Sequence, residues 1–186
     1  IDFASHFSGT VFLSGFGFSG LKTTDGGDSW QELHPGGGAL VNAVAFHPTQ
    51  SETLYLADKW EGVYKTTDGG ESWTVSHQGL TALYPLEMVA HPERPDVVYA
   101  RLNSEELYKG TRGGEIWERM PISRVASVQI DPITPTQIYV GRSGDPAYVY
   151  VSDDGGRTWK PSTPLPEAVG CEGWSFPWTL LALPQK

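Results

Sequence analysis

Cysteine, positive charge and long apolar runs are all scarce in this chain of 186 residues. The single cysteine, Cys171, excludes an internal disulfide and a cysteine-based metal cluster. Lysine and arginine number 13 against 22 aspartate and glutamate, so the net charge is −9. This balance argues against a surface for nucleic acid or anionic membranes and favours cationic or neutral partners. No apolar run reaches the roughly 18 to 20 residues of a membrane-spanning helix, so no membrane span is expected.

Glycine, proline and aromatic residues are plentiful instead. The chain has 22 glycines, 14 prolines and 12% aromatic residues, which is typical of many short strands joined by turns. A hydrophobic fraction of 39% is enough for a packed interior. Because no segment shows the period of a long amphipathic helix, the composition predicts an all-β protein.

One short phrase returns four times. It reads TTDGGDSW at 23–30, TTDGGESW at 66–73, GTRGGEIW at 110–117 and SDDGGRTW at 152–159. The closing tryptophans are 43, 44 and 42 residues apart. A fixed period in the forties predicts one four-stranded antiparallel blade of a β-propeller per repeat. The blades are expected at about 1–34, 38–78, 83–120 and 124–163 of a single propeller domain, 1–186.

The chemistry of the phrase is that of a tight hairpin. Glycine supplies positive φ, and aspartate or hydroxyl side chains accept backbone N–H groups. The tryptophan is expected to fill the space beside the next blade. We therefore predict structural roles for Asp25, Gly27, Trp30, Asp68, Gly70, Trp73, Gly114, Trp117, Asp154, Gly156 and Trp159. His47 and His91 recur at one repeat position and are expected in turns, so we predict no metal site and no cofactor.

The two ends of the chain carry one strand too many for a closed ring. Residues 1–7 fit the innermost strand of the first blade, and residues 178–184 fit a fifth innermost strand. The surplus favours a partial ring of about four blades, with 164–186 starting a further blade of a larger propeller. A closed four-bladed ring, in which the last strand replaces the first, is the alternative. The aromatic stretch 174–181 could instead pair with another chain.

The phrase resembles the Asp-box, or BNR repeat. Copies one, two and four match at every defined position, whereas the third departs at Gly110, Arg112 and Ile116. From about residue 9 to 160 the chain is similar to xyloglucanase-type glycoside hydrolases, sortilin-type propellers and photosystem II assembly factor-like proteins. The shared features are inner strands ending in His-Pro or Asp-Pro and the run GVYKTTDGGESW at 62–73. The resemblance implies an extracytoplasmic setting, secreted, periplasmic, lumenal or at the cell surface, without choosing between enzyme and scaffold.

The resemblance also implies which face binds ligands. In such propellers the box hairpins lie on one face, and binding uses the opposite face of second-to-third-strand loops and interblade links. Glycoside hydrolysis needs two carboxyl groups there, and aromatic side chains serve as sugar platforms. The candidate carboxyls are Asp58, Glu61, Glu105, Glu106 and Asp145, and the candidate platforms are Trp60 and Tyr84.

Arginines offer a second possible site. Arg101 and Arg142 are expected at equivalent positions just after second strands, and with Arg124 they could bind an anion as sialidases do. Gly15 and Asp58 stand at the matching places of the first two blades and break the set. The xyloglucanase inner strand running Gly-Cys-Asp into a Gly-Gly turn is also absent. We therefore favour a non-catalytic binding or assembly module with a protein partner, and keep a polysaccharide hydrolase with a carboxylate pair as the alternative.

Overall fold

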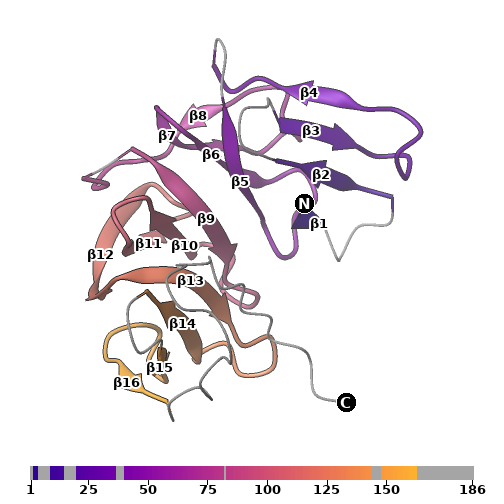
Figure 1. Ribbon diagram of the computed structural model, residues 1–186. Helices are drawn as coiled ribbons and strands as arrows, with labels where there is room; N and C mark the ends of the chain where they lie inside the picture. The colour runs from indigo at the N-terminus through magenta and orange to yellow at the C-terminus, as the bar shows by residue number, and fades with distance from the viewer. Residues whose placement is uncertain are drawn as a thin grey trace, which may run out of the picture.

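The computed structural model describes residues 2–3, 9–14, 20–36, 40–81, 83–143 and 148–162. These residues form four antiparallel sheets of four strands each and contain no helix. Each sheet takes consecutive strands in chain order, and the sheets follow one another around an arc (Figure 1). The predicted all-β propeller architecture, with about four blades of a partial ring, is confirmed.

The strand bounds follow the repeat. The first sheet contains β1 (Asp2–Phe3), β2 (Val11–Leu13), β3 (Gly20–Thr23) and β4 (Gln31–Leu33). The second contains β5 (Val41–Phe46), β6 (Leu54–Asp58), β7 (Gly62–Thr66) and β8 (Thr74–Val75). The third contains β9 (Pro85–Ala90), β10 (Val98–Leu102), β11 (Glu106–Thr111) and β12 (Ile116–Ser123). The fourth contains β13 (Val125–Ile130), β14 (Ile138–Arg142), β15 (Tyr148–Ser152) and β16 (Lys160–Pro161).

The first strand of each sheet lies toward the middle of the arc and the last lies at its periphery (Figure 1). Neighbouring inner strands are tied together directly. Asn42 Nδ2 of β5 donates to the carbonyl of Pro85 in β9 at 3.0 Å. The carboxylate of Glu87 in β9 accepts the N–H of Val128 in β13 at 3.3 Å.

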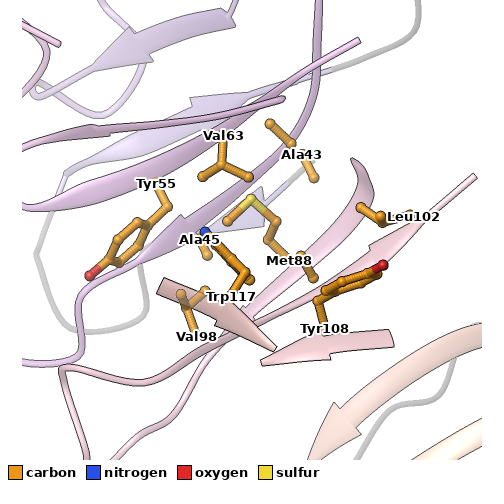
Figure 2. Packing of buried hydrophobic residues seen from close by; sticks show 11 residues of the cluster. Ala43, Ala45, Tyr55, Val63, Met88, Val98, Leu102, Tyr108 and Trp117 are labelled. Atoms are coloured by element: carbon orange, nitrogen blue, oxygen red, sulfur yellow. The ribbon is translucent and has the colours of Figure 1, made fainter. Parts of the chain in front are cut away.

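The cores lie between the sheets, so a central blade is buried on both faces. All five residues of β6 are buried. Leu54 and Leu56 point toward the first sheet, whereas Tyr55 and Ala57 point toward the third. In the core between sheets two and three, Met88 and Trp117 meet side chains of the second sheet that include Tyr55 and Val63 (Figure 2). This alternation explains why the strands read as almost continuous apolar runs.

In the second, third and fourth sheets, the turn between the first two strands is closed by a side chain at one recurring position. His91 Nδ1 accepts the N–H of Arg94 at 3.0 Å, and His47 does the same for Gln50 at 3.1 Å. Asp131 replaces histidine in the fourth sheet and accepts the N–H of Thr134 at 2.9 Å. Burial, with help from the cations of Arg94 and Lys109, lowers the pKa of His91 to about 4. The histidine is therefore a neutral acceptor at physiological pH.

Candidate functional site

Three of the four boxes share one hydrogen-bonded hairpin. In the second box, Thr66 Oγ1 donates to Asp68 Oδ1 at 2.6 Å and accepts the N–H of Gly70 at 3.0 Å. Asp68 also accepts the N–H of Ser72 at 2.9 Å and its hydroxyl. Gly69 and Gly70 have φ of 73° and 101°, a conformation that glycine favours. The hydrogen bonds hold the pKa of Asp68 well below its usual range, the Ser72 hydroxyl contributing most.

The first and fourth boxes repeat this pattern. Asp25 accepts the N–H of Ser29 at 2.9 Å, and Asp154 accepts the N–H of Thr158 at 2.9 Å. Gly27 and Gly156 donate to Thr23 and Ser152 at 3.0 and 2.7 Å. Asp25, Asp68 and Asp154 are thus engaged within their own hairpins, so we do not expect these three carboxylates to act in catalysis.

The third box closes differently because it lacks the aspartate. Its Arg112 has a φ of 53°. In place of the missing aspartate bonds, the box is hydrogen-bonded to the second sheet. Ser76 Oγ donates to the carbonyl of Gly114 at 2.6 Å, and Trp117 Nε1 donates to the carbonyl of Ser76 at 2.7 Å. Trp117 is only 3% exposed.

The other box tryptophans are less buried. Trp73 and Trp159 are partly buried against neighbouring sheets. Trp30 differs from the prediction of a core residue, because 42% of it is exposed. Trp73, Trp117 and Trp159 pack against the sheet that precedes their own, so the prediction that they pack beside the next blade is wrong. Among the described residues no sheet precedes the first, and Trp30 has no such neighbour.

The loop face opposite the boxes is held to the interblade links by a repeated backbone bond. In the second, third and fourth sheets, the N–H after the second strand donates to a link carbonyl: Lys59 to Leu40 at 2.9 Å, Asn103 to Tyr84 at 2.8 Å, and Ser143 to Arg124 at 2.8 Å. The loops are thereby fixed on the rigid sheets.

Asp58, a candidate catalytic carboxyl, lies where the loop of the second sheet is hydrogen-bonded to the interblade link. It ends β6, is 1% exposed, and accepts three backbone N–H groups, those of Leu40, Trp60 and Glu61, each at 2.8 Å. A carboxylate with this many donors is a turn and link residue that has little capacity left for a substrate.

The candidate glutamates are also engaged. Glu61 accepts a hydrogen bond from the Tyr64 hydroxyl, and burial together with this bond raises the pKa of Tyr64 to about 12. Glu105 has a φ of 60° and accepts the Ser143 hydroxyl at 3.0 Å. Glu106 pairs with Arg119 at 2.9 Å. Asp145 lies outside the described residues.

The two candidate arginines do not occupy equivalent positions, and the prediction that they do is wrong. Arg101 pairs with Leu107 within β10–β11 and follows Tyr99 by two residues, whereas Arg142 pairs with Tyr148 in β14–β15 and follows the equivalent Tyr139 by three. Because strand side chains alternate, a one-residue offset turns the two arginines to opposite faces of their sheets.

Both arginines have partners within the fold. Arg101 Nε lies 3.2 Å from Glu87 Oε2. Arg142 Nε donates to the carbonyl of Ser123 at 2.9 Å, and its guanidinium lies 4.8 Å from the centroid of the Tyr150 ring. The pair therefore does not form a converging anion site.

The predicted platforms, in contrast, come together on the loop face. Trp60 is 64% exposed and meets Tyr84 edge to face, with ring centroids 5.7 Å apart. The Lys59 ammonium lies 4.7 Å from the Trp60 ring centroid and 5.6 Å from that of Tyr84. Leu83, which was not among the candidate binding residues, is 39% exposed beside Gly62. We call Lys59, Trp60, Leu83 and Tyr84 the loop-face patch.

The loop-face patch joins a loop and a link that are far apart in sequence. The sequence signal that could have indicated Leu83 is its position as an apolar residue directly before the predicted platform Tyr84.

Within the described ranges no group of three or more potential metal ligands occurs, and no helix could span a membrane.

Comparisons with known proteins agree with this architecture. A family model for the BNR/Asp-box repeat matches residues 150–161, the fourth box. Comparison with curated proteins gives no match. Similar solved structures include an ancestral GH74 enzyme, with 26% identity and a TM-score of 0.61 over 71% of this chain and 19% of that chain. The GH74 xyloglucanase from Xanthomonas campestris has 19% identity and a TM-score of 0.66 over 84% of this chain and 28% of that one.

YCF48 bound to D1 peptide is also similar, with 18% identity and a TM-score of 0.63 over 85% of this chain and 51% of that chain. The predicted resemblance to Asp-box propellers of the xyloglucanase and photosystem II assembly factor types is confirmed. The chain spans only about a fifth to a half of the length of these structures. Since the same fold occurs in GH74 enzymes and in a protein bound to a peptide, it does not decide the function.

Proposed function

We propose that this chain is a non-catalytic binding or assembly module that holds a polypeptide segment at the loop-face patch. The observation that carries the proposal is the contrast on one face. The candidate carboxyls Asp58, Glu61 and Glu105 are engaged by hydrogen bonds within the fold, whereas Trp60 presents 64% of its surface to solvent. Exposed aromatic residues on a rigid support are frequent anchors of protein interfaces.

The chemistry of the loop-face patch suits an apolar or aromatic side chain flanked by neutral or basic residues. Leu83 and the rings of Trp60 and Tyr84 supply apolar contact, and the chain carries a net charge of −9. The similar structure of YCF48 with a D1 peptide supports a peptide partner. We also propose that the module acts outside the cytoplasm, as the propellers that it resembles do, and fractionation of the producing cells would test this.

Hydrolysis of a polysaccharide is the second candidate. It is favoured by the similarity to GH74 enzymes and by Trp60, whose exposed ring could stack on a sugar. It needs a carboxyl pair, for which Glu61, Glu105 and Asp145 remain as candidates together with residues of further blades.

A phage-displayed library of 15-residue peptides tests the proposal against the chain and its Trp60→Ala variant. We expect selected peptides to share an aromatic or apolar residue and to lose about tenfold in affinity for Trp60→Ala, as for an interface anchor. Val75→Ala is the matched control, because Val75 is 61% exposed but lies on the peripheral strand β8.

The chain is assayed in parallel for turnover of xyloglucan and of sialosides. Turnover that Glu61→Gln or Glu105→Gln abolishes, with the fold intact by circular dichroism, would replace the binding proposal with the hydrolase. Peptides that bind Trp60→Ala as well as the parent chain would remove the loop-face patch as the site.

A further inference from the structure

The three joints between neighbouring sheets share one construction. A lysine on the third strand of each leading sheet lies over an aromatic ring of its own second strand. Lys22, Lys65 and Lys109 lie 5.8, 5.7 and 5.8 Å from the ring centroids of Phe12, Tyr55 and Tyr99. The same lysines reach the first paired glycine of the following box.

The lysine contact is a hydrogen bond where the box has its usual form. Lys22 Nζ donates to the carbonyl of Gly69 at 2.9 Å, and Lys109 Nζ donates to that of Gly155 at 3.5 Å. Lys65 Nζ lies so close to Gly113 that an added Cβ there would be only 2.4 Å from it. At each of the three joints, a lysine ammonium group therefore lies beside the first paired glycine of the following box.

The second paired glycine of the second, third and fourth boxes faces the end or the peripheral strand of the preceding sheet. A Cβ added at Gly70 would lie 2.7 Å from Leu33 Cδ2, and one at Gly156 would lie 2.5 Å from Met120 Cε. At the middle joint, Ser76 takes this place and bonds to Gly114. The second, third and fourth boxes therefore each contact a lysine and a second side chain of the preceding sheet.

The first box has no such neighbour in the part of the chain that the structure describes. A Cβ at Gly26 would meet nothing within 4 Å, and one at Gly27 would meet only Trp30 of the same box, at 3.9 Å. The 42% exposure of Trp30 follows, against 3% for Trp117.

The fourth sheet does not offer the complementary surface. Val151 occupies the place of the three lysines, since it pairs with Tyr139 as Lys65 pairs with Tyr55 and Lys109 with Tyr99. Val151 has no ammonium to donate to a box carbonyl. The fourth sheet, whether of this chain or of a second copy, therefore lacks the lysine that the box of the first sheet would receive.

We propose that the box face of the first sheet, formed by Gly26, Gly27 and Trp30, is a docking surface for a further blade of the same ring. That blade is distinct from the four described sheets. It carries a third-strand lysine over an aromatic ring and an apolar side chain on its peripheral strand. Because repeat units are stabilised mainly by nearest-neighbour interfaces, such a blade buries Trp30 and stabilises the first sheet.

The test adds a blade of known chemistry to the intact chain. Residues 83–124, which contain Tyr99, Lys109 and Met120, are duplicated in front of residue 1. Tryptophans are replaced by 5-fluorotryptophan, and the ¹⁹F resonance of Trp30 is assigned by its loss in Trp30→Phe. We expect the duplication to remove most of the water-to-deuterium isotope shift of Trp30, which reports its solvent exposure.

Two matched fusions isolate the lysine. One carries Lys109→Met in the added copy, and the other adds residues 124–162, with Val151, in place of the third sheet. Both are expected to leave Trp30 more exposed than the parent fusion does. A folded parent fusion in which Trp30 keeps its full isotope shift, or equal protection in all three fusions, would overturn the proposal.

Lys22→Met in the unmodified chain keeps the inference testable if a fusion does not fold. The joint chemistry requires this variant to increase the isotope shift of Trp73 in the following box and to lower the unfolding midpoint. If neither quantity changes, the lysine contributes nothing to a joint, and the lysine requirement is wrong.

Discussion

Replacing Trp117 with alanine is expected to destabilise the fold more than the same change at any other box tryptophan. Trp117 is 3% exposed, belongs to the core between sheets two and three (Figure 2), and donates Nε1–H to the carbonyl of Ser76 at 2.7 Å. Truncating a buried tryptophan costs about 3 to 5 kcal/mol, since transfer and cavity terms add. For a domain of this size, such a loss lowers Tm by on the order of 10 °C.

Trp30→Ala is the matched control, because it removes the same side chain from the same repeat position. Trp30 is 42% exposed, so we expect a loss below about 1 kcal/mol. Trp117→Phe separates packing from hydrogen bonding: it keeps an aromatic ring and loses the bond to Ser76, and should cost about 1 to 2 kcal/mol.

Urea unfolding followed by far-ultraviolet circular dichroism measures all three variants without relying on tryptophan fluorescence. A loss below about 1 kcal/mol for Trp117→Ala would show that this box is not packed as described. Equal losses for Trp117→Ala and Trp30→Ala would refute the claim that a preceding sheet is what buries a box tryptophan.

Two further predictions concern backbone space and pH. Gly79→Ala should lower the free energy of unfolding by more than about 2 kcal/mol, because its Cβ would lie 2.3 Å from the backbone oxygen of Trp117. Gly26→Ala is the control: its Cβ meets only the strain of positive φ, which costs about 1 kcal/mol. Similar losses for the two variants in urea unfolding would contradict this. Folding lowers the pKa of His91 from 6.5 to about 4, so the neutral histidine stabilises the fold above pH 6.5. This stabilisation, at most about 3 kcal/mol in the free energy of unfolding, is lost as the pH falls toward about 4. His91→Asn should flatten the unfolding free energy across that window, and an unchanged pH profile would exclude His91 as the cause.

The repeat made most of the fold predictable, because the features that define a blade are local. The spacing of Trp30, Trp73, Trp117 and Trp159 predicted one blade per repeat, and four sheets of four strands are found. The inner strands expected to end in His-Pro or Asp-Pro include β5, which His47 and Pro48 follow directly. Box turns close through side chains two to four residues apart, as in Thr66 and Asp68, so sequence alone contains their chemistry.

The candidate site was less predictable, because its geometry depends on distant contacts and strand register. The Leu40 N–H that engages Asp58 is 18 residues away in an interblade link. The faces of Arg101 and Arg142 are set by a single-residue offset that a count from strand ends does not detect. The exposure of Trp30 depends on a neighbouring sheet, which no pattern within its own repeat reports.

The contacts on the loop face also decide what catalysis would require. An inverting or retaining glycosidase needs two carboxyls about 5 to 10 Å apart, one of them able to donate a proton. Asp58 accepts three backbone N–H groups, and changing it to asparagine should weaken the link to the first sheet whatever the chemistry of the face. Loss of activity in that variant would therefore not identify a catalytic acid, whereas loss in a folded Glu105→Gln variant would. The Glu105 side chain accepts the Ser143 hydroxyl, and a glutamine oxygen at this position can still accept that bond.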